Sequence, residues 1–280
     1  MSKTLTIASY LAIKEVWRNR GRFLLVAMVI ALITLLVLFI AALGEGLGNG
    51  NREYISKLNA ELVIYQAKSD NVIAASRLDR DRLAAVRRVA GVADAGMVGT
   101  SSASLILPEG VEPIKVALLG VEPGHSGEPG VVEGQQLSTD LASEVIIDRN
   151  TAFRSNLSVG DDLTVRVTQG TRDEFFNLRI VGVADGQQFQ LQPSIFVPFF
   201  TWDRIRSKSE AEVNCLTSVG NVIVVKLENP DQVEEVSQRL TTQVDNIQTA
   251  TISKAIQGLP GYKLLPCYGC FPFMVMVLLK

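Results

Sequence analysis

Residues that carry enzyme chemistry are scarce in this chain. Its 280 residues include one histidine, His125, which we expect to be an exposed residue of a polar loop. One histidine supports neither a zinc site nor a Ser-His-Asp triad, and no G-x-x-x-x-G-K-[ST] sequence is present to bind a nucleotide phosphate. Asp161 and Asp162 lie at a turn before a strand, where carboxylates are common for local reasons. We therefore expect no catalytic residue, no metal and no cofactor.

The chain also has few cysteines and little net charge. Cys215, Cys267 and Cys270 are too few for a disulfide scaffold. Cys267 and Cys270 have the spacing of a redox motif, but no helical pattern follows them; chance explains the spacing better than a metal or thiol role. The formal net charge of −2 leaves no basic stripe, so we expect no nucleic-acid partner.

The most informative stretch is the apolar run 23–43, whose one polar residue is Thr34. Roughly 21 residues at about 1.5 Å each span about 30 Å, the hydrocarbon thickness of a bilayer. Basic residues precede the run, and the first charge after it is Glu45. The pattern predicts a transmembrane helix with its N-terminal end in the cytoplasm. A cleaved signal peptide, favoured by the small-x-small triplet 42–44, and a buried soluble helix are the alternatives.

The segments that flank this run contain the candidate functional residues. Residues 2–19 have apolar positions at helical spacing, which indicates either a helix on the cytoplasmic membrane face or a leader that continues into the span. Gly44 and Gly48 have the small-xxx-small spacing that lets helices pack closely; a flexible exit from the membrane is the alternative, and 51–58 is again helical in pattern. The residues expected to set the topology are Lys14, Trp17, Arg18, Arg20 and Arg22.

Beyond residue 58 the pattern alternates between strands and helices, which predicts an α+β fold. Asp79 can cap a helix that ends at Gly91, and Asn229 can begin another. The strand–helix–strand pattern of 221–252 predicts a crossover unit. Strands are predicted at 62–65, 104–107, 114–121, 144–148, 163–167, 175–183, 195–199, 221–227 and 247–252, a short helix at 149–155, and loops at 122–134 and 187–192.

The C-terminal stretch 256–280 fits neither pattern. It is apolar but contains three prolines, and its apolar run 271–279 is too short to cross a bilayer. Prolines would also break a helix drawn through it. We expect an irregular tail.

Several stretches, in this order, resemble the MacB/FtsX-like ABC transporter permeases, and most of all the DevC-type exporters. The resemblance covers roughly residues 1–255. The stretches are IKEVWRNRGRF at 13–23, LLGVEPG at 118–124, LSVGDDL at 157–163 and VGVA at 181–184.

This resemblance implies a domain organisation. Residues 1–22 form a cytoplasmic amphipathic helix near an ATPase, 23–43 the transmembrane helix, and 44–58 a helical stalk. Residues 59–255 form a MacB-like periplasmic core domain of two subdomains, in which about 109–189 is inserted in the other. The tail, 256–280, follows.

The resemblance also implies a function and partners. The chain would be a permease subunit in the inner membrane, not itself an enzyme, that transmits ATP-driven helix motion to the periplasm (mechanotransmission). Its partners would be an ABC ATPase subunit, a periplasmic adaptor (membrane fusion) protein, an outer-membrane channel, a second copy in a homodimer, and membrane lipid. Family members have three further spans, so we expect a truncated or frame-shifted copy. The alternatives are a single-span extracytoplasmic binding or interaction protein and a membrane-tethered enzyme.

Overall fold

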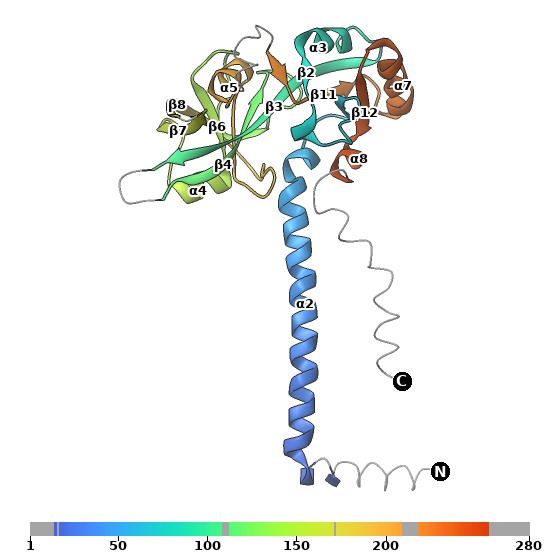
Figure 1. Ribbon diagram of the computed structural model, residues 1–280, viewed down its shortest axis with the longest axis vertical. Helices are drawn as coiled ribbons and strands as arrows, with labels where there is room; N and C mark the ends of the chain where they lie inside the picture. The colour runs from blue at the N-terminus through green and yellow to red at the C-terminus, as the bar shows by residue number, and fades with distance from the viewer. Residues whose placement is uncertain (1–13, 16, 108–111, 171, 209–217, 258–280) are drawn as a thin grey trace. The chain divides into compact units, whose positions relative to one another are not determined.

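The structure is a computed structural model that describes residues 14–257 except 16, 108–111, 171 and 209–217 (Figure 1). Most of the expected helix 2–19, the tail beyond 257 and all three cysteines therefore lie outside the described residues. The chain divides into two compact units, Met1–Leu47 and Gly48–Lys280. Each is considered by itself.

The apolar run lies in one long helix, α2 (Arg20–Ser56). Its most apolar 18-residue window, within the stretch Arg20–Ile40, has a mean hydropathy of 3.3 and no buried residue, and large side chains such as Leu24 and Phe39 are 65% and 60% exposed. Thr34 donates its hydroxyl to the Ile30 carbonyl at 2.9 Å, which satisfies the polar group within the helix. By length and composition this helix can cross a membrane.

Helix α2 continues without a break through Gly44 and Gly48. Both glycines are therefore helical, and helix packing and a flexible exit after the apolar run both stay predictions. The helical pattern of 51–58 is confirmed to Ser56, where α2 ends.

The second unit is built on a mixed sheet. Among the described residues it has ten strands, in the order β12-β1-β11-β3-β4-β9-β6-β8-β5, with β7 paired to β3 and β8; β2 and β10 form a separate small sheet. The strands are β1 (Leu62–Gln66), β2 (Leu78–Asp79), β3 (Val92–Ile106), β4 (Ile114–Val121), β5 (Val131–Gly134), β6 (Glu144–Asp148), β7 (Asp162–Gln169), β8 (Arg172–Ala184), β9 (Ser194–Pro198), β10 (Val219–Gly220), β11 (Val222–Leu227) and β12 (Ile247–Thr251).

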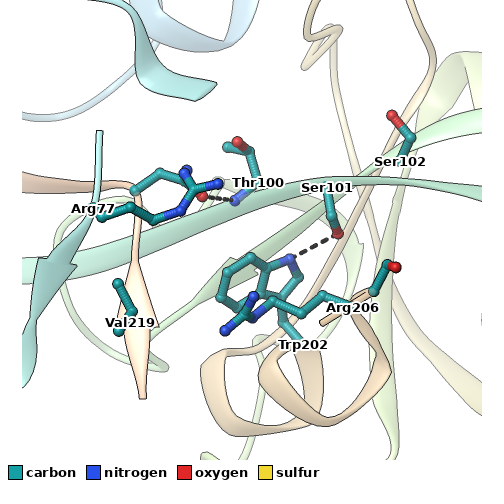
Figure 2. A pocket seen from close by; sticks show the side chains of 9 residues that line it. Arg77, Thr100, Ser101, Ser102, Trp202, Arg206 and Val219 are labelled. Carbon is teal, nitrogen blue, oxygen red and sulfur yellow. Dashed lines mark hydrogen bonds between the residues drawn. The ribbon is translucent and has the colours of Figure 1, made fainter. Parts of the chain in front are cut away.

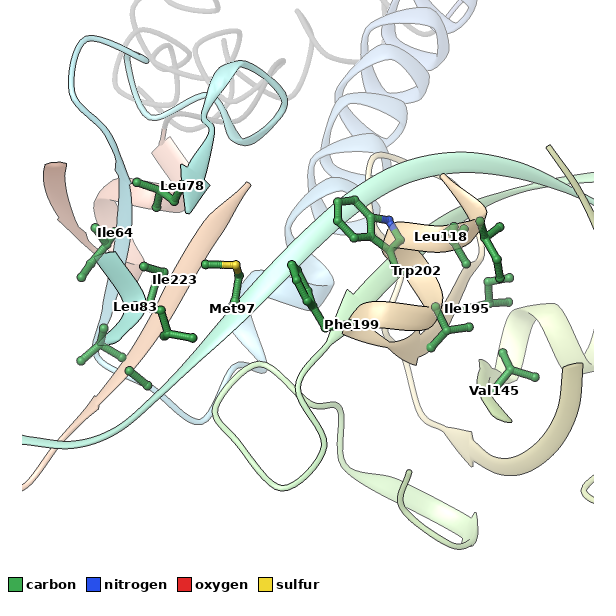
Figure 3. Close-up of a cluster of buried hydrophobic side chains, with 14 of the residues drawn as sticks. Ile64, Leu78, Leu83, Met97, Leu118, Val145, Ile195, Phe199, Trp202 and Ile223 are labelled. Atoms are coloured by element: carbon green, nitrogen blue, oxygen red, sulfur yellow. The ribbon is translucent and has the colours of Figure 1, made fainter. Parts of the chain in front are cut away.

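Helices cover both faces of this sheet. Because successive strand residues point to opposite faces, Ile223 and Val225 belong to one apolar cluster and Val222 and Val224 to the other. Side chains of α3, α5 and α7 complete the first cluster (Figure 3), and those of α8 and the last turn of α2 the second. The helices are α3 (Arg80–Val86), α4 (Arg149–Ser155), α5 (Phe199–Ile205), α7 (Val233–Gln243) and α8 (Ile252–Gln257), with 3-10 turns η1 (Ile73–Ala75) and η2 (Pro230–Gln232).

The strand–helix–strand unit of the last third is confirmed in outline. Strands β11 and β12 both pair antiparallel with β1, which lies between them, so they run parallel to each other. Asn229 begins the connection, because its side chain accepts a hydrogen bond from the Asp231 amide at 3.0 Å. Asp79 caps α3 in the same way through the Arg82 amide, although α3 ends at Val86 and not at Gly91.

Three predicted elements are wrong in extent or type. Strand β3 begins at Val92, since pairing with β11 and β4 makes a strand of a segment rich in small and polar residues. The predicted loop 122–134 contains β5, which pairs with β8. Phe199 opens helix α5 instead of ending a strand.

The division into two subdomains stays a prediction. Strands from the 109–189 segment and strands that flank it belong to one sheet, in which β4 lies between β3 and β9. The boundaries of the 59–255 domain likewise stay predictions.

Two glycines let Trp202 of α5 lie flat against the sheet. A Cβ atom built at Gly99 of β3 would lie 2.3 Å from the indole ring, and one at Gly120 of β4 would lie 2.4 Å from Trp202. The indole is 2% exposed and contacts Phe199, with ring centroids 5.4 Å apart. Because Gly99 and Gly120 have no side chains, β3 and β4 leave the space that the Trp202 indole fills.

Candidate functional site at the end of helix α2

The residues expected to set the topology lie on exposed surface. The exposed fraction of Trp17 is 75%, and the four basic residues are exposed as well. Their roles at a membrane or an ATPase stay predictions, as does helix packing at Gly44 and Gly48. The basic residues are Lys14, Arg18, Arg20 and Arg22.

The other end of α2 is buried in the α+β domain. Tyr54 and Ile55 are 3% and 2% exposed. The Tyr54 ring packs against Phe189 edge to face, at a centroid distance of 6.1 Å, and against Phe196 at 5.5 Å. Its hydroxyl donates to the Gly127 carbonyl at 2.9 Å. Burial raises the pKa of Tyr54, so the hydroxyl keeps the proton that it donates.

The loop 185–189 holds the same turn of α2 from a second direction. The Tyr54 amide donates to the Gln188 carbonyl at 3.1 Å. Lys57 donates to the Asp185 carbonyl at 3.0 Å and pairs with Glu53 at 3.5 Å. The Asp185 carboxylate in turn pairs with Arg149 of α4 at 2.9 Å. Residues 53–57, the loop 185–189 and Gly127 are called the α2 junction below.

The loop 122–128, which contributes Gly127, is held by its own hydrogen bonds. Asp94 of β3 accepts from the Ser126 amide at 2.6 Å, the Ser126 hydroxyl at 2.7 Å and His125 Nδ1 at 2.8 Å. Burial raises the pKa of Asp94, but the hydrogen bonds from Ser126 and His125 outweigh it and leave the pKa below its usual value. For Glu128 burial prevails over the hydrogen bonds from the Gly124 and Leu137 amides, and its pKa is raised.

The same loop begins at a buried carboxylate. Glu122 is 3% exposed and pairs with Arg87 at 2.8 Å and Arg80 at 3.1 Å, both from the α3 region. It also accepts from the Met97 amide at 3.1 Å. Arg87 donates further to the Ala95 carbonyl. Hydrogen bonds and ion pairs thus connect α3 and β3 to the loop that receives the Tyr54 hydroxyl.

Sequence reasoning missed these residues. Neither Tyr54 nor Asp94 was a candidate, and Glu122 appeared only inside the stretch 118–124. The sequence pattern that could have identified Glu122 is a glutamate that directly follows the apolar strand 114–121. His125 is an exposed loop residue, as expected, with 42% of its side chain exposed, and its Nδ1 is bound to Asp94. The local interpretation of Asp161 is confirmed, since Asp161 accepts from the Ser158 amide at 2.8 Å.

The contacts at the α2 junction are hydrogen bonds, ion pairs and aromatic packing. Within the described part of the chain, no group of three or more His, Cys, Asp or Glu side chains is placed to hold a metal ion. An apolar helix of membrane-spanning length that ends inside a mixed α+β domain defines a membrane-anchored domain.

The comparison with protein families identifies this domain. The model described as "MacB-like periplasmic core domain" matches residues 23–243, and the chain belongs to this family. The family is a component of transporter permeases and not the ATPase itself. A comparison with the curated proteins finds no match.

Similar solved structures include two transporter domains. The extracellular domain of the ABC-type transporter YknZ from Gram-positive bacteria has 15% identity and a TM-score of 0.48, with 68% of this chain and 99% of that chain covered. The periplasmic region of MacB from Actinobacillus actinomycetemcomitans has 14% identity and a TM-score of 0.49, with 73% and 95% covered.

Proposed function

We propose that the chain is a permease subunit of an ABC-type exporter that transmits ATP-driven movement of α2 to its extracytoplasmic domain. The observation that carries this proposal is the α2 junction, where the helix that begins as an apolar span ends with Tyr54 buried among aromatic rings. The family membership supports the transporter context.

The physical argument concerns stiffness. The backbone hydrogen bonds of an α-helix tie each residue to the fourth one before it, and we propose that they carry a displacement within α2 to its last turn. Flexible glycine linkers would absorb it, but the glycines after the apolar run are helical. Tyr54, Lys57 and Glu53 then pass the displacement to the loops 122–128 and 185–189.

The proposal includes an orientation and partners. The basic residues before the span favour a cytoplasmic N-terminus in the inner membrane and a periplasmic domain. Lys14, Trp17, Arg18, Arg20 and Arg22 would face lipid headgroups and an ABC ATPase. Gly44 and Gly48 would let α2 of a second copy approach, and the domain would meet an adaptor and an outer-membrane channel.

Hydrogen–deuterium exchange tests the transmission. The full chain is purified in nanodiscs with the ATPase encoded beside it, and exchange of the loops 122–128 and 185–189 is measured with and without ATP. We expect ATP to change exchange in both loops. In the double variant Tyr54→Ala/Ile55→Ala the response should vanish while ATP hydrolysis persists, because the two substitutions leave the cytoplasmic side intact.

The exposed neighbour Ser56 provides a matched control, since Ser56→Ala should keep the full response. An unchanged ATP response in the double variant, with the domain folded by circular dichroism, would rule out transmission through the junction. Failure of any ATPase to co-purify would favour the second candidate, a single-span interaction protein.

A further inference from the structure

A polar pocket opens beside Trp202 (Figure 2). Its volume is about 340 Å³, roughly eleven times the share of one liquid water molecule. The walls come from β3, from the end of α5 and from the segments before β2 and β11. The main lining residues are Arg77, Thr100, Ser101, Ser102, Trp202 and Arg206.

The lining is cationic and rich in hydroxyl groups. Among the described lining residues, two are arginines, four carry hydroxyls, one is an asparagine, and none is acidic. Arg206 donates through Nε to Asp203 at 2.8 Å, and the same carboxylate pairs with Lys208 at 3.1 Å. Arg77 has no carboxylate partner in the part of the chain that the structure describes. The pocket therefore has an excess positive charge centred on Arg77.

The guanidinium of Arg77 is also fixed in place. Its Nη1 donates to the Ala74 and Ser76 carbonyls, each at 2.9 Å. Its Nε and Nη2 make no hydrogen bond within the described residues, so one edge of the planar fork is free. That edge presents two parallel N–H groups, the geometry that matches a carboxylate or a phosphate.

The rest of the pocket is rigid before any ligand enters. The Trp202 Nε1 donates to the Ser101 hydroxyl at 3.0 Å. The Asn221 side chain accepts from the Thr100 amide at 2.7 Å and donates to the Ile73 and Ser76 carbonyls. Figure 2 shows Arg206 extended along the indole, with its guanidinium carbon 5.2 Å from the ring centroid. A fixed frame lowers the ordering cost of binding.

We propose that this pocket binds a small organic anion through a carboxylate or phosphate group. The free edge of Arg77 pairs with two oxygens of that group. The volume exceeds what a bare ion fills, so the anionic group belongs to a small molecule. The proposal does not depend on transmission through the α2 junction.

Trp202 is a built-in reporter of this binding. The chain has two tryptophans, so Trp17→Phe leaves Trp202 as the only one. The full-length W17F chain in nanodiscs is titrated at constant ionic strength with sodium phosphate, with sodium succinate, or with sodium chloride as the control. We expect a saturable change in emission with phosphate or succinate and none with chloride; the stronger of the two identifies the preferred group.

Arg77→Gln should weaken this binding about 10- to 100-fold, the usual effect of losing a charge-assisted pair of hydrogen bonds. Arg77→Lys keeps the positive charge but loses the planar fork. Its affinity for the anion should therefore lie between that of Arg77→Gln and that of the W17F chain with Arg77 intact. Arg88→Gln is the matched control, because Arg88 is an exposed arginine at the end of α3 outside the pocket. Thermal unfolding followed by circular dichroism checks that each variant is folded.

Three results would overturn the proposal. The first is a response that does not saturate or that chloride reproduces. The second is a folded Arg77→Gln chain that binds as tightly as W17F. The third is an equal loss in Arg77→Gln and Arg88→Gln, which would indicate general charge attraction and not a site.

Discussion

The Tyr54 hydroxyl donates a hydrogen bond to the backbone carbonyl of Gly127, 73 residues further along the chain. Gly127 has a φ of +106°, and a Cβ atom built on it would lie 2.6 Å from Val98 Cγ2. A glycine is therefore required to bring this carbonyl to the helix end. The bond joins α2 to a loop that begins at the buried Glu122 and is fastened to β3 through Asp94.

Tyr54→Phe should reduce the free energy of unfolding by about 1–2 kcal/mol, because it leaves the buried Gly127 carbonyl without its partner. Urea denaturation of the full chain in detergent measures the change. Tyr65→Phe is the matched control. The Tyr65 hydroxyl is buried and has no hydrogen-bond partner among the described residues, so its removal should be neutral or slightly stabilising. Equal losses in both variants would contradict the assignment.

Glu122→Gln should cost about 2–3 kcal/mol of unfolding free energy. The amide keeps the shape but leaves Arg80 and Arg87 without their shared anion, and breaking one partner of a buried ion pair is strongly destabilising. Both arginines are partly exposed, so solvent screens their charges and the cost is smaller than for a fully buried ion pair. Glu133→Gln, on an exposed residue of β5, should be neutral in the same urea experiment. A neutral Glu122→Gln would show that the cluster adds nothing to stability.

Charge reversal of Arg18, Arg20 and Arg22 to glutamate should disturb the orientation of α2, because basic residues resist transfer across the bilayer. The reporter is Glu174→Cys, on an exposed position of β8, in a chain whose three natural cysteines are serines. A membrane-impermeant maleimide added to intact spheroplasts should label this cysteine, and charge reversal should lower the labelling several-fold. Arg88→Glu should leave it unchanged. Labelling that survives charge reversal would show that these arginines do not set the topology.

Local patterns in the sequence were sufficient for the elements that are apolar throughout or clearly capped. The apolar run predicted α2, and strand β4, strand β6 and helix α4 begin and end at the predicted residues. Each has a signal within its own few residues: consecutive β-branched or leucine side chains for the strands, and a preceding aspartate for α4.

Tertiary pairing decides the elements that were missed. The first half of β3 reads VADAGMVGTSS and becomes a strand because β11 and β4 hydrogen-bond to it. The α2 junction and the Glu122 cluster join residues far apart in the chain, for which no local spacing exists. The pocket at Trp202 likewise depends on Gly99 and Gly120 of neighbouring strands, which the sequence shows only as two isolated glycines.

Gly99→Ala and Gly120→Ala should each destabilise the domain by about 1–3 kcal/mol or more, since an added methyl group overlaps the buried indole of Trp202. In the W17F background both should also change the emission of Trp202 and weaken anion binding in the adjacent pocket. Gly130→Ala is the control, because nothing lies within 4 Å of its added Cβ atom. A Gly120→Ala chain with unchanged stability and emission would show that the indole does not lie against β4.

Asp94→Asn should lower stability by about 1 kcal/mol at neutral pH, where the carboxylate accepts its hydrogen bonds in the ionised form. The folded-state pKa of Asp94 lies below its usual value, so ionised Asp94 contributes fully above its unfolded pKa of about 3.9. This contribution is lost as pH falls through the lower, folded pKa. Stability is measured by urea denaturation from pH 7 to pH 3. Lys226 faces Asp94 across the ladder.

The stability difference between the chain that keeps Asp94 and the Asp94→Asn variant should therefore stay constant down to about pH 5 and then shrink towards pH 3. Glu128→Gln should show the opposite pH dependence of stability, because burial raises the pKa of Glu128. A carboxyl group with a raised folded pKa destabilises the fold when it ionises, so the chain that keeps Glu128 should gain stability relative to the Glu128→Gln variant as pH falls. The opposite result is a stability difference between the chain that keeps Asp94 and the Asp94→Asn variant that grows as the pH falls. That result would show that burial, and not the hydrogen bonds from Ser126, sets the direction of the Asp94 pKa shift.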